Sequence, residues 1–534
     1  MILRRFPTTF SSQSKAVRTA ISCLCVGFVT QFLSAQEITS FYVREYRVEG
    51  AKRLPRLEVE EAVYPYLGPA RGPGDVEQAR VALEKAYHDK GLQTVSVVIP
   101  QQDPRFGVIR LQVVEAKVGR LRVNGARFFL PSRIKSAAPS VAEGELPDMN
   151  RVEKEIVALN RLGDRTVKPE LRAGVEPGTV DIDLNVEDKS PLHGSLELNN
   201  QYSADTTELR LNGSISYGNL FQLGHTGSLS FQIAPQNLDD AQVYSGYYLA
   251  RVSDGVSLML QGTKQNSDVS TLGGAAVAGR GEIVGLRALW DLPVTDTFYQ
   301  TFSFGMDYKN FAEDIVVGKD IVSSPIEYYP LAANYGATWM GKDGFTELNH
   351  SLNFHLRGMG SRETDYANKR YNADASYVYL RSDLSHVHDL KGGSQVFGKV
   401  QGQIASRPLV NGEQIAGGGL ETVRGYLEAT ALGDNGVFGT VEFRSPSFIG
   451  TPDENGKRAS EWRLHAFTDG GLVGIYDALP SQQRRYGFAS VGAGTRFMLL
   501  NRYNGSLDAG VPLIDQANAD AGEVRVTFRG WADF

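Results

Sequence analysis

Apolar and polar residues alternate along the chain from Ser190 to Phe534, in one short segment after another. Because successive side chains of a strand point to opposite faces, each segment predicts a strand with one apolar and one polar face. Segments of about ten residues separated by turns are typical of a transmembrane β-barrel, in which the apolar face meets lipid and the polar face lines the lumen. The clearest apolar positions are Leu209, Leu211, Ile215 and Tyr217, then Leu229, Phe231 and Ile233, then Val256, Leu258 and Leu260.

The length of this region sets the size of the predicted barrel. About 340 residues follow Ser190, and about 20 residues per strand with its turn or loop make about 16 antiparallel strands. The last alternating segment, 524–534, ends on the aromatic residue Phe534. A soluble β-sandwich would alternate in the same way, with its polar face in solvent instead of in a lumen.

A short motif repeats in the first part of the chain. The sequence Arg-Val-x-Gly-Ala occurs at 47–51 and returns 75 residues later at 122–126. Around the first copy the pattern predicts a strand, two helices and two strands. The first strand is expected at 41–48, followed by a short helix after Pro55 and a longer helix from Asp75 to Gly91. The last two strands are expected at 93–99 and 108–114. The second copy has its longer helix at 149–162 and a last strand with Val180, Ile182, Leu184 and Val186 inward. The repeat therefore predicts two small α/β domains, 36–116 and 117–189, ahead of the barrel at 190–534.

The first 35 residues have the features of a secretory signal peptide. Arg4, Arg5, Lys15 and Arg18 precede an apolar run of about ten residues, and cleavage is expected after Ala35. The run is too short to span a bilayer as a helix. An exported protein without a long apolar helix can cross a membrane only as a closed barrel.

Composition excludes several classes of function. The formal charge of −6 gives no basic field for nucleic acid. The only cysteines, Cys23 and Cys25, lie in the predicted signal peptide, so no cysteine chemistry is expected after cleavage. His386 and His388 share one side of a strand, but the sequence offers no third ligand, and we predict no metal site. Without a nucleophile elbow, a phosphate loop or a zinc-binding helix motif, we expect neither catalysis nor a cofactor.

A long irregular stretch at 408–436 interrupts the strands. It contains three consecutive glycines and the turn sequence Gly433-Asp434-Asn435-Gly436. A connection of this length is expected to be functional or disordered. At its centre lies Val423-Arg424-Gly425-Tyr426, where Gly425 permits a sharp turn and Arg424 needs an acceptor.

An acceptor occurs on a later strand, in Phe467-Thr468-Asp469-Gly470-Gly471, where Phe467, Asp469 and Gly471 share one face. The two motifs in this order resemble those of the two-partner secretion transporters, the haemolysin activation/secretion proteins of the outer-membrane insertase superfamily. The resemblance implies that the loop folds back into the barrel and that Arg424 pairs with Asp469 on the inner wall. It also implies that the two N-terminal repeats are POTRA domains in the periplasm.

The resemblance implies a function and several partners. A large secreted exoprotein, β-helical and haemagglutinin- or haemolysin-like, would bind the POTRA domains while unfolded and cross the barrel without ATP. Phe534 resembles the signal by which the barrel assembly machinery recognises its substrates, and outer-membrane lipid would surround the barrel. Members of the family often carry a plug helix before the first POTRA domain, but only 36–40 precede the first strand here, so we expect no plug.

Two other functions stay open from the sequence. An insertase that folds other barrels into the membrane would share the POTRA-barrel plan, although two repeats are few for that role. A passive porin would share the barrel but would not need the repeats. A large exoprotein encoded beside this chain would favour secretion.

Overall fold

The computed structural model describes residues 40–267, 269–270, 277–278, 280–317, 320–453, 457–480 and 482–534. The predicted signal peptide and the segment 36–39, on which the expectation about a plug rests, lie outside these residues. The chain divides after Glu115 into two compact units. None of the helices in the described part is long and apolar enough to cross a membrane.

The first unit is a small α/β domain. Its central sheet has the order β2-β5-β4, with β2 parallel and β4 antiparallel to β5. The elements are β1 (Phe41–Val43), β2 (Glu45–Glu49), α1 (Arg56–Val63), β3 (Gly68–Arg71), α2 (Pro73–Asp89), β4 (Val95–Val98) and β5 (Val108–Glu115). Leu83 and Tyr87 of α2 and Leu111 of β5 are fully buried in its core.

Helix α2 begins two residues before the position predicted from the sequence. Asp75 is in its first turn and is not the residue that precedes it, and its carboxylate accepts the N–H of Gly72 at 2.8 Å. This hydrogen bond satisfies one of the free N–H groups at the helix start and lowers the pKa of the Asp75 carboxyl.

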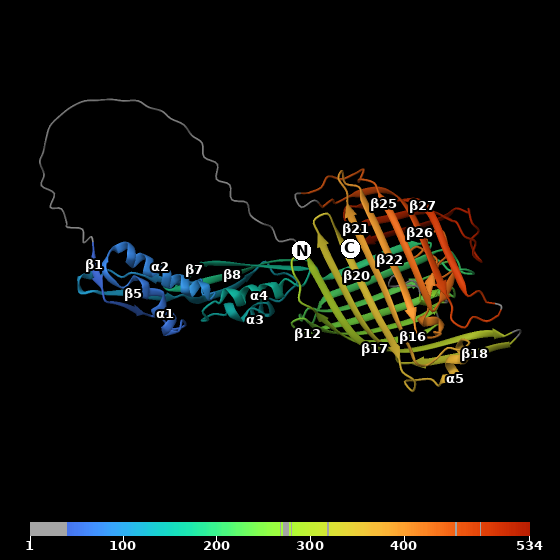
Figure 1. Ribbon diagram of the computed structural model, residues 1–534, viewed down its shortest axis with the longest axis horizontal. Coiled ribbons are helices and arrows are strands. Elements are labelled where there is room, and N and C mark those ends of the chain that lie inside the picture. The colour runs from blue at the N-terminus through green and yellow to red at the C-terminus, as the bar shows by residue number, and fades with distance from the viewer. Residues whose placement is uncertain are drawn as a thin grey trace, which may run out of the picture. The chain divides into compact units, whose positions relative to one another are not determined.

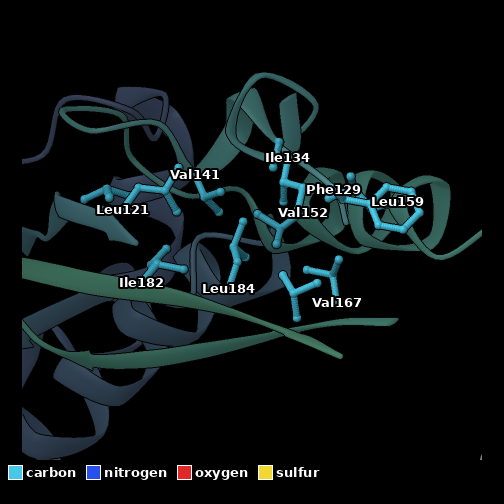
Figure 2. Packing of buried hydrophobic residues seen from close by; sticks show 12 residues of the cluster. Leu121, Phe129, Ile134, Val141, Val152, Leu159, Val167, Ile182 and Leu184 are labelled. Carbon is cyan, nitrogen blue, oxygen red and sulfur yellow. The ribbon is translucent and has the colours of Figure 1, made fainter. Parts of the chain in front are cut away.

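The second unit opens with a domain of the same plan. Its sheet has the order β6-β8-β7 and carries two helices on one face. The elements are β6 (Lys117–Asn124), α3 (Pro131–Ser136), α4 (Met149–Leu159), β7 (Arg165–Ala173) and β8 (Thr179–Asp188). Figure 2 shows the core between these layers, with Ile182 and Leu184 of the sheet opposite Ile134 and Val152 of the helices.

The repeated glycine has the same conformation in both copies. Gly50 and Gly125 each have φ +86°, which favours glycine. A Cβ atom would lie 2.4 Å from the carbonyl oxygen of Val113 in one copy and of Val186 in the other. The sequence repeat therefore marks the turn where the first strand of each sheet ends beside its neighbour.

The rest of the second unit is a closed antiparallel barrel (Figure 1). Segments β18 and β19 both pair with β17 and form one strand interrupted at Tyr329-Pro330, so 16 strands close the barrel over the described residues. The strands are β9 (Leu192–Asn199), β10 (Arg210–Leu220), β11 (His225–Ile233), β12 (Ala241–Ser253), β13 (Val256–Ser267), β16 (Gly281–Asp291), β17 (Phe298–Val317), β18 (Asp320–Tyr328), β19 (Leu331–Gly341), β20 (Gly344–His355), β21 (Tyr377–Asp389), β22 (Gln395–Ala405), β25 (Asn435–Arg444), β26 (Glu461–Gly474), β27 (Arg485–Leu499), β28 (Tyr503–Pro512) and β29 (Arg525–Asp533). The predicted fold class and strand number are confirmed.

The outer face of the barrel is apolar, as the alternation predicted. Ile215, Leu229 and Leu260 are 50%, 67% and 52% exposed on it, where lipid would cover them. Strand β29 pairs with β9 to close the ring. The last residue extends this seam, because the backbone of Phe534 exchanges hydrogen bonds with Gly194 at 2.8 and 3.0 Å.

Candidate functional site in the barrel lumen

The long connection between β22 and β25 folds back into the barrel. We call residues 406–434 the lumen loop. The sequence predicted irregular chain at 408–436, but the structure contains a short antiparallel hairpin, β23 (Ile415–Gly417) with β24 (Ala431–Gly433). The hairpin fits against the wall because Gly417 has no side chain: a Cβ atom there would lie about 3 Å from Phe488, Val473 and Phe438.

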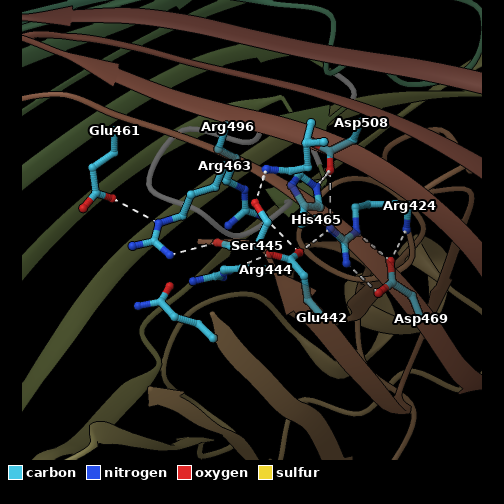
Figure 3. A network of polar contacts seen from close by, with 12 residues as sticks. Arg424, Glu442, Arg444, Ser445, Glu461, Arg463, His465, Asp469, Arg496 and Asp508 are labelled. Carbon is cyan, nitrogen blue, oxygen red and sulfur yellow. Dashed lines mark hydrogen bonds and ion pairs between the residues drawn. The ribbon is translucent and has the colours of Figure 1, made fainter. Parts of the chain in front are cut away.

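Arg424, at the tip of the lumen loop, forms a bidentate ion pair with Asp469 of β26 (Figure 3). Its Nε and Nη2 donate to the two carboxylate oxygens at 2.8 and 2.9 Å. The backbone N–H of Arg424 donates to the same carboxylate at 3.1 Å. The structure thus brings together the loop residue and the strand residue that the sequence singled out.

Two further carboxylates surround the same guanidinium. Nη1 of Arg424 donates to Glu442 of β25 at 2.7 Å and lies 3.4 Å from Asp508 of β28. The Arg424 side chain is 5% exposed, and the three carboxylate side chains are 1–2% exposed. Sequence reasoning missed Glu442 and Asp508, whose only signal is that each occupies an inward position of its strand.

The network continues along the wall through two more arginines and a histidine. Glu442 also accepts from Arg444 at 2.7 Å and from Arg496 at 3.1 Å. The His465 ring lies 2.6 Å from Asp508. Because several cations share these buried carboxylates, the tip is held by a network and not by a single pair.

The remaining motif residues shape the part of the barrel wall that the loop tip contacts. The Arg424 guanidinium lies 3.4 Å from the ring centre of Phe467, a cation–π contact. Gly471 makes room for Phe438, because a Cβ atom would lie 2.2 Å from that ring. Gly425 has φ +95° and passes close to the backbone of Gly510.

The two apolar neighbours of the tip are also anchored. The Tyr426 hydroxyl lies 2.8 Å from the carbonyl oxygen of Ile514 and 3.0 Å from that of Ala489. Its ring meets Phe488 edge-on, with centroids 5.1 Å apart. Val423 is fully buried in the apolar cluster that also contains Tyr426 and Phe488. All four residues of the Val-Arg-Gly-Tyr motif therefore contact the barrel or its core cluster.

The N-terminal root of the lumen loop has an anchor that the sequence did not indicate. The fully buried carboxylate of Glu413 accepts from Lys309 at 2.6 Å and from the hydroxyls of Tyr328 and Tyr379, each at 2.7 Å. These partners lie on β17, β18 and β21. No motif could have revealed this contact, because the partners are far apart in sequence.

A second buried carboxylate fixes the C-terminal root. Asp434 forms a bidentate pair with Arg370, at 2.7 Å for both bonds, next to α5 (Glu363–Lys369). It also accepts the N–H groups of Leu409 and Tyr476 at 2.8 and 2.7 Å. The sequence indicated only a turn here. In the structure Asp434 contacts three connections between strands: β20–β21 through Arg370, the lumen loop through Leu409, and β26–β27 through Tyr476.

Asp434→Asn is expected to loosen this root. The substitution keeps the shape and removes the charge, and disrupting a buried ion pair costs up to about 3–5 kcal/mol. Trypsin should then cut within 406–434 faster than in the unmodified protein. Asp477→Asn, at an exposed position in the same region, is the control. Equal cleavage rates for the two variants would contradict a role of Asp434 in holding the loop.

Two family models match the sequence. The model for the POTRA domain, ShlB-type, matches residues 41–116. The model for the haemolysin secretion/activation proteins ShlB/FhaC/HecB matches residues 178–497, more than half of the chain. The chain belongs to the haemolysin secretion/activation protein family. It is an outer-membrane transporter of two-partner secretion, with a POTRA domain at its N-terminus.

Individual relatives agree with the family. The outer membrane transporter CdiB of Dickeya dadantii strain 3937 is 22% identical over 409 residues, which cover 74% of this chain and 71% of that protein. The structure of CdiB from Escherichia coli has a TM-score of 0.60 at 19% identity and covers 95% of this chain and 92% of its own. BamA from Haemophilus ducreyi lacking POTRA domains 1–3 has a TM-score of 0.55 at 14% identity, covers 92% of this chain and all of its own, and shows the shared fold.

His386 and His388 of this family member lie on the outer face of β21. Their rings stack with centroids 5.9 Å apart, and Nδ1 of His386 lies 2.8 Å from the Thr346 hydroxyl. The described residues contain no group of three or more His, Cys, Asp or Glu side chains that could hold a metal ion.

Proposed function

We propose that this transporter binds an unfolded exoprotein through its POTRA domains and passes it through the barrel without ATP. The observation that supports this function best is the lumen loop, whose tip is seated on the inner wall by Arg424, Asp469 and Glu442. A loop held on one part of the wall leaves a cavity beside it through which an extended chain could pass. Because the outer membrane has no nucleotide supply, folding of the partner outside would drive transfer.

The proposed domain organisation follows from the repeat. Residues 1–35 are the signal peptide, 36–116 and 117–189 are two POTRA domains, and 190–534 form the barrel with the inward loop at 408–436. The glycine that ends the first strand has the same conformation in both repeats, which supports a second POTRA domain at 117–189. Phe534 is proposed as the signal read by the barrel assembly machinery.

The exposed edge of β7 is a suitable site for an added strand. Val167 directs its N–H and C=O away from β8, toward the side-chain amide of Asn160, at 2.6 and 3.0 Å. In an antiparallel ladder the backbone N–H and C=O groups of every second residue point away from the partner strand. Leu171 and Ala173 therefore direct these groups to the same free edge as Val167. Asn160 thus covers the start of the edge, and an extended peptide would add beyond Pro169.

Residues 36–189, made alone, are expected to bind the N-terminal segment of the proposed exoprotein partner in its unfolded form. Backbone hydrogen bonds would dominate, so added salt should change affinity only modestly. Leu171→Pro, which removes an outward N–H, should weaken binding, whereas Glu170→Ala, on the opposite face, should not. Calorimetry that detects no binding at high micromolar concentration would refute the role of the POTRA domains.

A further inference from the structure

Five neighbouring strands carry a hydroxyl residue at the same level of the inner wall. The ladders place them directly opposite one another: Ser195 of β9, Ser214 of β10, Ser230 of β11, Ser245 of β12 and Thr263 of β13. We call this set the hydroxyl row. Hydrogen bonds join two pairs within it, Ser195 to Ser214 at 2.7 Å and Ser230 to Ser245 at 3.2 Å.

Three of the five residues of the hydroxyl row face the space that the lumen loop leaves open. A cavity of about 580 Å³ lies between them. Ser195, Ser214 and Ser230 line it on the barrel wall, and Ala416, Gly418 and Thr422 line it on the loop. The residues next to the row in sequence, such as Ile215 and Leu229, point outward toward lipid.

The two sides of the lumen differ in chemistry. The wall that holds the loop tip carries carboxylates and guanidinium groups in charge-assisted contacts. The row instead offers neutral hydroxyls, each able to donate and to accept. Four charged residues beside the cavity form two ion pairs, Glu197 with Arg529 at 2.7 Å and Lys399 with Glu421 at 3.7 Å. The other charged residues that line it, Arg381, Asp383 and Glu428, have neutral hydrogen-bond partners: Gln403, Asn349 and the backbone N–H of Leu420.

Neutral hydroxyls are suited to a moving chain. An unfolded polypeptide carries an N–H and a C=O at every residue, and these groups need partners wherever water is excluded. Hydrogen bonds between neutral groups are weaker than charge-assisted ones and exchange more readily, whereas fixed charges would retain oppositely charged residues of the cargo. The paired hydroxyls also satisfy one another when no chain is present.

We propose that the hydroxyl row is the contact site for the extended backbone of the secreted polypeptide during transfer. The path would run between β9–β13 and the lumen loop, with the loop tip still held on β25, β26 and β28. This inference rests on the proposed secretion function and specifies where in the lumen it takes place.

Thr263→Val tests the row, because valine has the shape of threonine without the hydroxyl. The rate at which the full-length protein secretes its exoprotein partner should fall about fivefold, as expected for the loss of one hydrogen bond. Thr468→Val, on the outward face of β26, is the matched control and should leave the rate unchanged. Ser214→Val should likewise be slower than the size-matched Ser214→Thr. Heat-modifiable migration on gels checks that each barrel is folded.

Equal secretion by Thr263→Val and Thr468→Val would overturn the proposal while leaving the secretion function intact. If the unmodified protein secretes no partner, the function itself fails, and the inference fails with it. A second measurement needs no exoprotein and still tests the proposal if one of the valine variants folds poorly. A positively charged methanethiosulfonate reagent should reduce the current through Ser214→Cys in planar bilayers, and an unchanged current would show that the row does not line the open path.

Discussion

Arg424→Ala is expected to reduce secretion of the partner at least tenfold while the barrel still reaches the outer membrane. The substitution leaves Asp469 buried without the Arg424 cation, while Glu442 keeps Arg444 and Arg496. Removing one partner of a buried ion pair costs about 3–5 kcal/mol. The cost falls on the seat of the lumen loop, because the strand ladders of β25 and β26 do not involve the Arg424 side chain.

Two further variants separate geometry from charge. Arg424→Lys should restore secretion only in part, because an ammonium group cannot make the two parallel bonds to Asp469. Glu421→Ala, on the same loop but half exposed, should have little effect, since an exposed ion pair contributes about 1 kcal/mol or less. Immunoblots of outer-membrane fractions report the amount of inserted barrel, and secreted partner is measured in the medium.

A double-mutant cycle then tests whether the two motif residues act together. Arg424→Ala and Asp469→Ala should be strongly non-additive in secretion, because each removes the same contact. Additive effects would show that the pair observed in the structure has no joint role in transport. A pair that only stabilises the barrel would instead lower the amount of inserted protein and leave secretion per barrel unchanged.

Deletion of Phe534 is expected to remove nearly all of the protein from the outer membrane. The residue extends the closing seam by two backbone hydrogen bonds to Gly194, and its ring fills the space where a Cβ atom of Gly194 would lie. Deletion removes the ring and both bonds.

Phe534→Ala separates the two contributions, because it keeps the backbone bonds and removes only the aromatic ring. If the assembly machinery reads the ring, both variants should be lost from the membrane to a similar extent. Normal insertion of Phe534→Ala would contradict the assembly-signal role and leave seam closure as the function of the residue. Membrane fractionation with heat-modifiable gels measures both outcomes.

Local sequence features were sufficient to predict the fold and the centre of the site. Alternation identified the strands and their outward face, and the repeat identified two α/β domains because a glycine with positive φ ends the same strand in each. Arg424 and Asp469 were predictable because each lies in a recognisable motif. The start of α2 was misplaced by two residues, since Asp75 acts from within the first turn instead of before it.

Other parts of the site depend on register across the sheet, which the sequence does not reveal. Glu442 and Asp508 reach Arg424 only because strands β25 to β28 are staggered as they are. Asp434 resembled an ordinary turn residue, and Glu413 has partners on three distant strands. The hydroxyl row requires four successive ladders in the correct register, so no single segment could indicate it.

The central claim, that the protein secretes an exoprotein, is tested most directly by deleting the gene in its host. Two quantities are then measured together. The amount of the exoprotein partner in the medium and the amounts of unrelated outer-membrane barrels are measured in cells with and without the gene. A translocator predicts that the exoprotein disappears from the medium and is retained in the periplasm, while the other barrels are unchanged. Normal secretion of the exoprotein with a loss of the other barrels would contradict this account and favour an insertase.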